Sequence, residues 1–194
     1  MKIVTVILAG GKSSRMGEDK SLLEINGEVF LRNIYHIAQQ CTEEVYVICP
    51  KPKKYISILP FCNFIPESQF FQGPLMAFHE ALNYVQSDWV LLLACDLPFL
   101  TVIELKYWIN SLCNLPENIM AFLPKNEKGW DCLCGFYRPS CRESLQKYLS
   151  QGNRSFQQWL NQEKVAEILV KNREILFNCN TPQDYELLKN ITQK

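Results

Sequence analysis

Glycines and basic side chains follow an uncharged, strand-forming stretch at the start of the chain. Residues 3–9 carry no charge, and the loop beyond them contains Gly10, Gly11, Lys12, Arg15 and Lys20. A buried strand of a parallel sheet reads as a continuous apolar run, and glycines just past its end let backbone N–H groups approach a phosphate that a Cβ atom would block. Because the basic side chains can neutralise phosphate charge, this stretch predicts a phosphate-binding site.

A carboxylate follows a second apolar run. Asp96 comes directly after residues 89–95. Open α/β sheets bind ligands outside the carboxyl ends of their strands, and Mg²⁺ prefers one or two carboxylates together with phosphate oxygens. Taken alone, Asp96 fits a helix-capping role equally well, but beside the predicted phosphate site we favour Mg²⁺ binding.

Strand-like runs alternate with helical periodicity, which predicts βαβ units and a mostly parallel sheet in a single domain, residues 1–194. Strands are expected near residues 3–9, 21–26, 45–49, 63–65, 89–95, 119–123, 132–137, 165–170 and 175–177. Helices are expected near residues 29–40, 73–85, 102–112, 138–149, 156–160 and 183–188. Thr101 is expected to cap the third helix, and Thr181 or Asn180 the last.

The composition excludes several classes of protein. Twenty basic and twenty acidic residues give no net charge, whereas a sequence-independent nucleic-acid binder needs a basic excess. The apolar runs are too short to span a membrane. The chain has nine cysteines, and this odd number favours free thiols in a reducing compartment over a disulfide framework. Cys132 and Cys134 are the only close pair, and neither a second pair nor a nearby histidine completes a zinc site with them. We expect a cytoplasmic protein that binds neither nucleic acid nor a membrane.

Residues 8–20 read LAGGKSSRMGEDK. This stretch does not fit the Walker A motif, because no glycine stands five positions before Gly11, and it does not fit GxGxxG, because its glycines are adjacent. The stretch resembles the signature LAGGxSxRMGxDK of the molybdenum cofactor guanylyltransferases, and every fixed position is present. This resemblance implies that Arg15 and Lys20 neutralise phosphate charge during catalysis. The nucleotide contacts that it implies are Leu8, Ala9, Gly10, Gly11, Lys12 and Lys20.

Further motifs of the same family follow in order. Residues 94–100, ACDLPFL, resemble the segment with the metal-binding aspartate, which implies that Asp96 holds Mg²⁺ and contributes to catalysis and nucleotide binding. Gly73-Pro74-Leu75 matches the family's GPL, where a glycine permits close approach and a helix start offers free N–H groups. Glu67 stands where the family often has a nucleotide-binding aspartate, so we assign Glu67 to the nucleotide, with a solvated loop charge as the alternative.

Motifs in the second half of the chain resemble the family's substrate side. Asn178-x-Asn180-Thr-Pro matches the NxNTP stretch, which implies contacts from Asn178 and Asn180 to a pterin; two turn asparagines are the competing interpretation. Residues 130–137, WDCLCGFY, resemble the family's substrate strand, which usually has a proline where Cys132 stands. Arg154 and Ser155 resemble a loop near the pterin site.

The resemblance covers essentially the whole chain and implies a three-layer α/β/α, Rossmann-like nucleotidyltransferase fold with a mostly parallel mixed sheet. The implied reaction is Mg²⁺-dependent transfer of GMP from GTP to the phosphate of molybdopterin, with or without molybdenum, releasing pyrophosphate. Molybdenum insertion proteins and apo-molybdoenzymes are implied as further partners. Two alternatives stay open: a cytidylyltransferase acting on molybdopterin or on a sugar or polyol phosphate, and a degenerate nucleotide-binding module. None of these residues reads guanine, so base selectivity rests on the resemblance.

Overall fold

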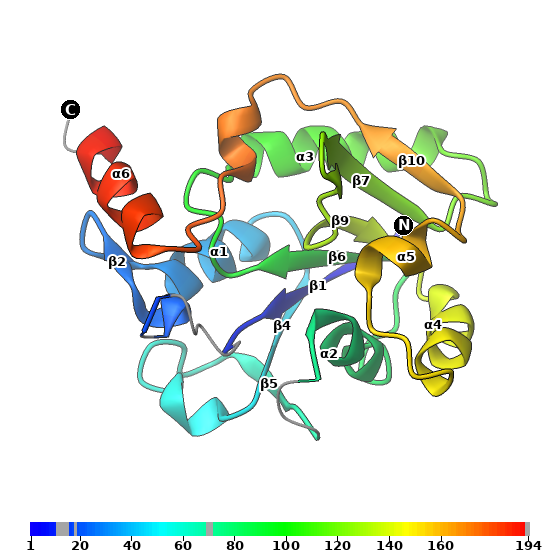
Figure 1. Cartoon of the computed structure of the whole chain (residues 1–194), viewed down its shortest axis with the longest axis horizontal. Helices are drawn as coiled ribbons and strands as arrows, with labels where there is room; N and C mark the ends of the chain where they lie inside the picture. The colour runs from blue at the N-terminus through cyan, green and yellow to red at the C-terminus, as the bar shows by residue number, and fades with distance from the viewer. Residues whose placement is uncertain (11–15, 18, 69–71, 193–194) are drawn as a thin grey trace.

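An eight-stranded mixed sheet forms the centre of this computed structural model, which describes residues 1–10, 16–17, 19–68 and 72–192 (Figure 1). Its strands are β1 (Ile3–Leu8), β4 (Glu44–Cys49), β5 (Asn63–Pro66), β6 (Trp89–Ala94), β7 (Ala121–Asn126), β8 (Gly129–Trp130), β9 (Cys134–Tyr137) and β10 (Val165–Ile168). They follow the order β10-β7-β9-β6-β1-β4-β5, with β8 paired to β7. In that order only β9 runs antiparallel to its neighbours, β6 and β7, which confirms the expected mostly parallel sheet with an antiparallel strand.

Helices cover both faces of the sheet and give the molecule three layers. The helices are α1 (Phe30–Gln39), α2 (Pro74–Ala81), α3 (Val102–Ser111), α4 (Cys141–Ser150), α5 (Phe156–Leu160) and α6 (Pro182–Thr192). Leu31 of α1 and Trp108 of α3 are buried in the core on one face, and α2, α4 and α5 bury their apolar sides on the other. Each face of β1 is therefore covered, which explains why this strand carries no charged side chain and why its one hydroxyl, that of Thr5, is buried and hydrogen-bonded to the Thr42 hydroxyl.

Helix α6 lies apart from these layers and packs on a small hairpin formed by β2 (Glu24–Ile25) and β3 (Glu28–Val29) (Figure 1). Leu188 of α6 shares a buried cluster with Leu23 and Phe30, and the Tyr185 hydroxyl donates to the Glu24 carbonyl oxygen at 2.6 Å. Helix α6 is thereby fixed against the β2–β3 hairpin and the start of α1.

The strand order places a ligand crevice between β1 and β6. From β1 the chain moves outward through β4 to β5 and then returns to β6 on the other side of β1. Ligands of open α/β sheets bind at such a switch point, outside the carboxyl ends of the strands. Leu8 pairs with Ala94, so Gly10 and Asp96 emerge from neighbouring strands at the same edge.

Several boundaries differ from the sequence prediction. The strand expected at residues 175–177 is wrong: residues Arg173–Leu176 form a 3₁₀ turn, η4, which the Asn172 side chain caps by accepting from Glu174 N. The strand expected at 21–26 is confined to β2, because Lys20–Leu22 is a 3₁₀ turn, η1, capped by Asp19. Helix α4 starts at Cys141 rather than at residue 138. The caps at Thr101 and Thr181 are confirmed.

Two general features bear on the class of protein. In the part of the chain that the structure describes, no helix combines the length and apolar character needed to cross a membrane. All nine cysteines are free thiols.

Candidate active site

Three motifs that are far apart in the sequence meet at the Lys20 ammonium group. Lys20 Nζ lies 3.2 Å from Asp96 Oδ2 and donates a second hydrogen bond to Asn180 Oδ1 at 2.5 Å. Only 16% of the Lys20 side chain and 12% of the Asp96 side chain are exposed, so solvent screens this ion pair weakly. The backbone supports the same meeting point, because Cys179 N donates to the Asp96 carbonyl oxygen at 3.2 Å. Of the predicted site residues, the structure therefore brings together Lys20, Asp96 and Asn180.

Ser21 holds the start of the loop after β1 against the end of β6. Its side chain is buried, its Oγ accepts from Gly10 N at 3.3 Å, and the same Oγ lies 3.3 Å from Cys95 Sγ. Gly10 has a φ of +88°, and a Cβ atom there would lie 2.8 Å from Pro50 Cδ. The glycine predicted for close approach of a phosphate is thus also required by the neighbouring loop.

Asp19 fastens this loop to the one after β4. Its Oδ2 accepts from the Tyr55 hydroxyl at 2.7 Å and from Lys54 Nζ at 2.6 Å, and its Oδ1 accepts from Ser21 N at 3.0 Å. Burial by itself raises the pKa of Asp19, but the hydrogen bonds from Lys54, Tyr55 and Ser21 outweigh it and hold the pKa below the ordinary carboxyl value. Asp19 is therefore an ionised anchor of the loop at neutral pH.

Other residues assigned to the nucleotide lie along the same edge of the sheet. Leu8 ends β1, Ala9 is buried directly after it, and Glu67 directly follows β5. Gly73 precedes α2 with a φ of +93°, a conformation that L side chains rarely adopt, which explains the glycine of Gly-Pro-Leu. The remaining predicted ligands lie outside the described residues: Gly11, Lys12 and Arg15.

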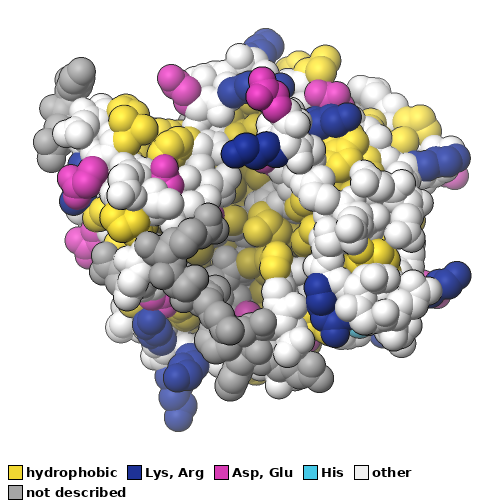
Figure 2. All heavy atoms as spheres, viewed as in Figure 1, with side chains coloured by type: hydrophobic (Ala, Val, Ile, Leu, Met, Phe, Trp, Pro, Cys, Tyr) yellow, Lys and Arg dark blue, Asp and Glu magenta, His cyan; other side chains and the backbone are white. Residues whose placement is uncertain are grey.

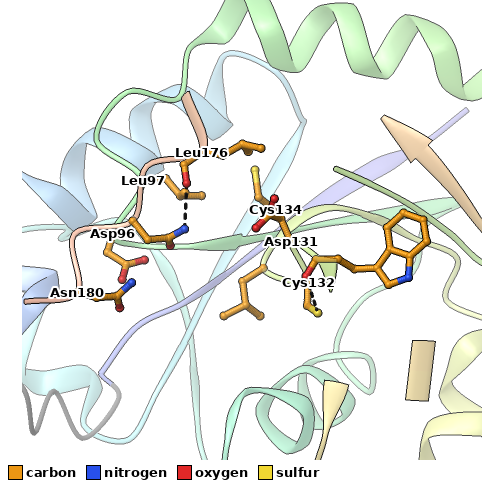
Figure 3. A pocket seen from close by; sticks show the side chains of 10 residues that line it. Asp96, Leu97, Asp131, Cys132, Cys134, Leu176 and Asn180 are labelled. Carbon is orange, nitrogen blue, oxygen red and sulfur yellow. Dashed lines mark hydrogen bonds between the residues drawn. The ribbon is translucent and has the colours of Figure 1, made fainter. Parts of the chain in front are cut away.

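A pocket of about 300 Å³ opens beside Asp96, and we call it the Asp96 pocket (Figure 3). Its walls come from the end of β6, the connection from β8 to β9 and the segment before α6. The polar and sulfur-bearing side chains among its lining residues include Asp96, Asp131, Cys132, Cys134, Asn178 and Asn180. The space-filling view shows one face of the molecule hollowed near its centre, with hydrophobic side chains inside the hollow (Figure 2). A volume of this size lies at the lower end of the range for small-molecule sites.

The residues assigned to the pterin divide into two groups. Asn178 and Asn180 line the Asp96 pocket, and Asn178 Nδ2 donates to the Leu176 carbonyl oxygen at 3.0 Å. Arg154 and Ser155 are not among the lining residues. Arg154 Nη1 donates to the carbonyl oxygens of Leu149 and Asn153, and Ser155 caps α5 by accepting from Gln158 N.

Helix α5 instead reaches the pocket wall through Gln157, a residue that none of the sequence motifs contains. Gln157 Oε1 accepts from Trp130 N at 3.0 Å, and its Nε2 donates to the Trp130 carbonyl oxygen and to Cys132 Sγ. The Tyr137 hydroxyl supports the same connection by donating to the Cys132 carbonyl oxygen at 2.7 Å. These contacts fix the backbone from which Asp131 projects. Asp131 itself was also missed, although it is the one acidic residue of the segment WDCLCGFY.

The Asp96 carboxylate beside Lys20 is a suitable ligand for a Mg²⁺ ion that binds together with a nucleotide. Asp96 is a carboxylate with 8% of its surface exposed, at the edge of the sheet where phosphates are expected. Within residues 1–10, 16–17, 19–68 and 72–192, no three His, Cys, Asp or Glu side chains form a group that could hold a metal ion. Mg²⁺ usually keeps several waters and binds through one or two carboxylates plus substrate phosphates. A single protein carboxylate therefore suits a metal shared with phosphate oxygens rather than a separate structural ion.

Comparisons with known proteins show which family this chain resembles. The sequence profile of the MobA-like NTP transferase domain matches residues 5–167. A protein of Trichormus variabilis named "Probable molybdenum cofactor guanylyltransferase" is 47% identical over 96% of this chain and 90% of that protein. A protein of the same name from Synechococcus elongatus is 42% identical over 97% of this chain and 99% of that protein.

A solved structure supports the same fold. The "Molybdopterin-guanine dinucleotide biosynthesis protein A" of Archaeoglobus fulgidus superposes with a TM-score of 0.81, over 98% of both chains. At 20% identity this likeness concerns the fold alone.

Proposed function

The chain belongs to the MobA-like NTP transferase family and is a nucleotidyltransferase, and we propose that it transfers GMP from GTP to the phosphate of molybdopterin, releasing pyrophosphate. The observation that carries this proposal is the contact of Lys20 with both Asp96 and Asn180. It joins the motif assigned to the nucleotide with the motif assigned to the acceptor, as a group-transfer enzyme requires. The family membership and the names of the relatives supply the identity of the two substrates.

In the proposed reaction an oxygen of the molybdopterin phosphate attacks the α-phosphorus of GTP. A new bond forms between that oxygen and the α-phosphorus, and the bond from the α-phosphorus to the oxygen that leaves with pyrophosphate breaks. Catalysis of this step depends on alignment and charge neutralisation, because a phosphate monoester is already ionised near neutral pH and needs no general base. Lys20 neutralises phosphate charge at the point where the two substrates meet, and Asn180 orients the Lys20 ammonium group.

Asp96 is the residue that would hold Mg²⁺, and the bound ion supplies additional positive charge to the phosphates. On the nucleotide side, Gly10 approaches the phosphates, with Gly73 and Glu67 near the rest of the nucleotide. On the acceptor side, the Asp96 pocket takes the pterin, with Asn178 in its wall. A cytoplasmic location is part of the proposal and is supported by the nine free thiols.

Thermal unfolding with Mg²⁺ and each of GTP, CTP, ATP and UTP tests the nucleotide, and pyrophosphate release with molybdopterin tests the transfer. A ligand at about one hundred times its dissociation constant adds roughly 2.7 kcal/mol to the free energy of unfolding. We expect a GTP-selective shift and GTP-dependent pyrophosphate release. A CTP-selective shift with CTP-dependent turnover would instead identify a cytidylyltransferase, and the absence of turnover with every nucleotide would identify a non-catalytic module.

A further inference from the structure

One carboxylate oxygen in the wall of the Asp96 pocket has no partner. Asp131 follows β8, and its Oδ1 accepts from Asn126 Nδ2 at 2.8 Å. Its Oδ2 is buried and makes no hydrogen bond to any residue that the structure describes. Leaving a buried carboxylate oxygen unpaired destabilises the folded protein, so a hydrogen-bond donor that reaches Oδ2 from the pocket would be bound favourably.

Backbone hydrogen bonds on both sides fix the position of Asp131. Asp131 N donates to the Pro124 carbonyl oxygen at 2.9 Å, and the Asp131 carbonyl oxygen accepts from Cys134 N at 3.1 Å. Figure 3 shows this carboxyl group near Cys134 and pointing into the pocket, with Asp96 and Asn180 on the opposite side. The pocket therefore has two polar ends, one at Asp131 and the other at Asp96 and Lys20.

The chemistry of the Asp131 end selects a hydrogen-bond donor. Among the described residues, no Lys, Arg or His side chain forms an ion pair within 4.0 Å of this carboxylate, and the rest of the pocket lining includes leucine, cysteine and tryptophan side chains. Burial raises the pKa of Asp131, against the opposing effects of Asn126 and of the positive charge of Arg173, so the charged form gains from any N–H group that reaches it. A phosphate would be repelled there and belongs at the Lys20 end.

We propose that Asp131 binds the 2-amino and N3–H edge of the pterin ring and so sets the orientation of the acceptor. This inference rests on the proposed function. A pterin carries these two N–H donors side by side, in the arrangement that a guanidinium group offers to a carboxylate, and such paired, charge-assisted hydrogen bonds are strong and directional. The phosphate of molybdopterin lies at the other end of its ring system. Binding the amino edge at Asp131 therefore directs the phosphate toward Asp96 and Lys20.

Guanine offers the same pair of donors, so the position of Asp131 decides between the two rings. The nucleotide motifs lie after β1 and β5 and before α2, whereas Asp131 belongs to the β8–β9 connection on the other side of β6. Asp131 shares its pocket with Asn178 and Asn180, the motif assigned to the acceptor. This placement favours the pterin.

The test compares Asp131→Asn with wild type and with Glu127→Gln, which removes one charge from an exposed position of the same hairpin. The amide of Asp131→Asn keeps one oxygen that can accept from Asn126. Its NH2 group replaces Oδ2 and cannot accept a hydrogen bond from the amino edge of the pterin. We expect the KM for molybdopterin to rise about 10- to 100-fold, with kcat at saturation and the KM for GTP within threefold of wild type. Glu127→Gln should match wild type in all three constants.

Binding supplies a second readout that does not depend on turnover. Calorimetric titrations use pterin-6-ylmethyl phosphate and the corresponding lumazine, in which an oxygen replaces the 2-amino group. Wild type should bind the pterin at least 10-fold more tightly than the lumazine, and Asp131→Asn should bind the two compounds equally. The ratio of the two dissociation constants does not depend on the active fraction of the preparation. An unchanged ratio would overturn the inference. Loss of discrimination between GTP and ITP would assign Asp131 to guanine instead, and failure of the proposed function would show separately, as absence of transfer by wild type.

Discussion

Lys20 Nζ and Asp96 Oδ2 lie 3.2 Å apart, although 76 positions separate the two residues in the chain. The cation assigned to phosphate therefore neutralises the carboxylate assigned to Mg²⁺. Arrival of Mg²⁺ and GTP would give each group a new partner of opposite charge. The pair thus keeps two charges satisfied in a site that is largely shielded from water.

Replacement of Lys20 by methionine should lower kcat for guanylyl transfer by about 10² to 10³, the usual effect of removing one group that stabilises transition-state charge. The change removes the ammonium group but keeps most of the length of the side chain. Steady-state kinetics measures the loss. Lys147→Met, on the exposed side of α4, is the control and should keep wild-type activity. A Lys20→Met enzyme within tenfold of wild type would refute the assigned role.

Asp96→Asn should remove the Mg²⁺-dependent part of the stabilisation by GTP. An amide is a poorer ligand for Mg²⁺ than a carboxylate, so the variant should show the same small shift in unfolding temperature with GTP whether or not Mg²⁺ is present. Wild type should show a larger shift with the metal than without it, measured by calorimetry at equal nucleotide concentration. If Asp96→Asn kept the full Mg²⁺-dependent shift, the metal would have to bind elsewhere.

Much of the fold and part of this site could be predicted from the sequence. The strand ends at Gly10 and Asp96 were readable because uncharged runs end there, and parallel strands bring their carboxyl ends to one edge. Contacts such as that of Asp19 with Tyr55 could not be predicted, since they depend on how two loops of irregular backbone meet. The run at residues 175–177 was wrongly predicted to be a strand because a short apolar stretch carries no period that separates a strand from a buried turn.

Gly10→Ala should destabilise the protein more than Gly152→Ala, although both glycines have a positive φ. A Cβ atom at Gly10 would lie 2.8 Å from Pro50 Cδ and 3.1 Å from the Tyr55 hydroxyl, whereas one at Gly152 would meet no atom within 4 Å. The shared conformational cost cancels in the comparison, so the difference in unfolding free energy should reflect the clash, about 1–3 kcal/mol. Urea unfolding measures it. Equal effects of the two substitutions would show that the loop after β4 moves aside freely.

Asp19→Asn should lower the free energy of unfolding at neutral pH and should lower it much less in acid. The pKa of Asp19 is lower in the folded protein than its ordinary value, so its ionised form contributes stability above that ordinary value, and this contribution is lost as the pH falls through the folded value. We expect the variant to lose about 1–2 kcal/mol at pH 7, with the gap from wild type narrowing below about pH 4. Urea unfolding at several pH values gives the profile. A gap that does not change with pH would mean that the charge of Asp19 contributes nothing.

Asp131→Asn should have the opposite effect on stability. Burial raises the pKa of Asp131, so its ionised form costs folding free energy at pH values above the folded pKa, and this cost disappears as the pH falls below the ordinary carboxyl value. A neutral amide avoids the cost, and the unfolding temperature at pH 7 should rise by on the order of 2 °C, with the gain vanishing near pH 3.

A gain in stability combined with weaker acceptor binding would mark Asp131 as a residue kept for function at the expense of the fold. Calorimetry of Asp131→Asn and wild type across this pH range gives the comparison, with Glu127→Gln as the exposed control, which should show no pH-dependent gain. Destabilisation by Asp131→Asn at pH 7 would instead mean that the carboxylate stabilises the hairpin through Asn126, which accounts for its burial without a ligand.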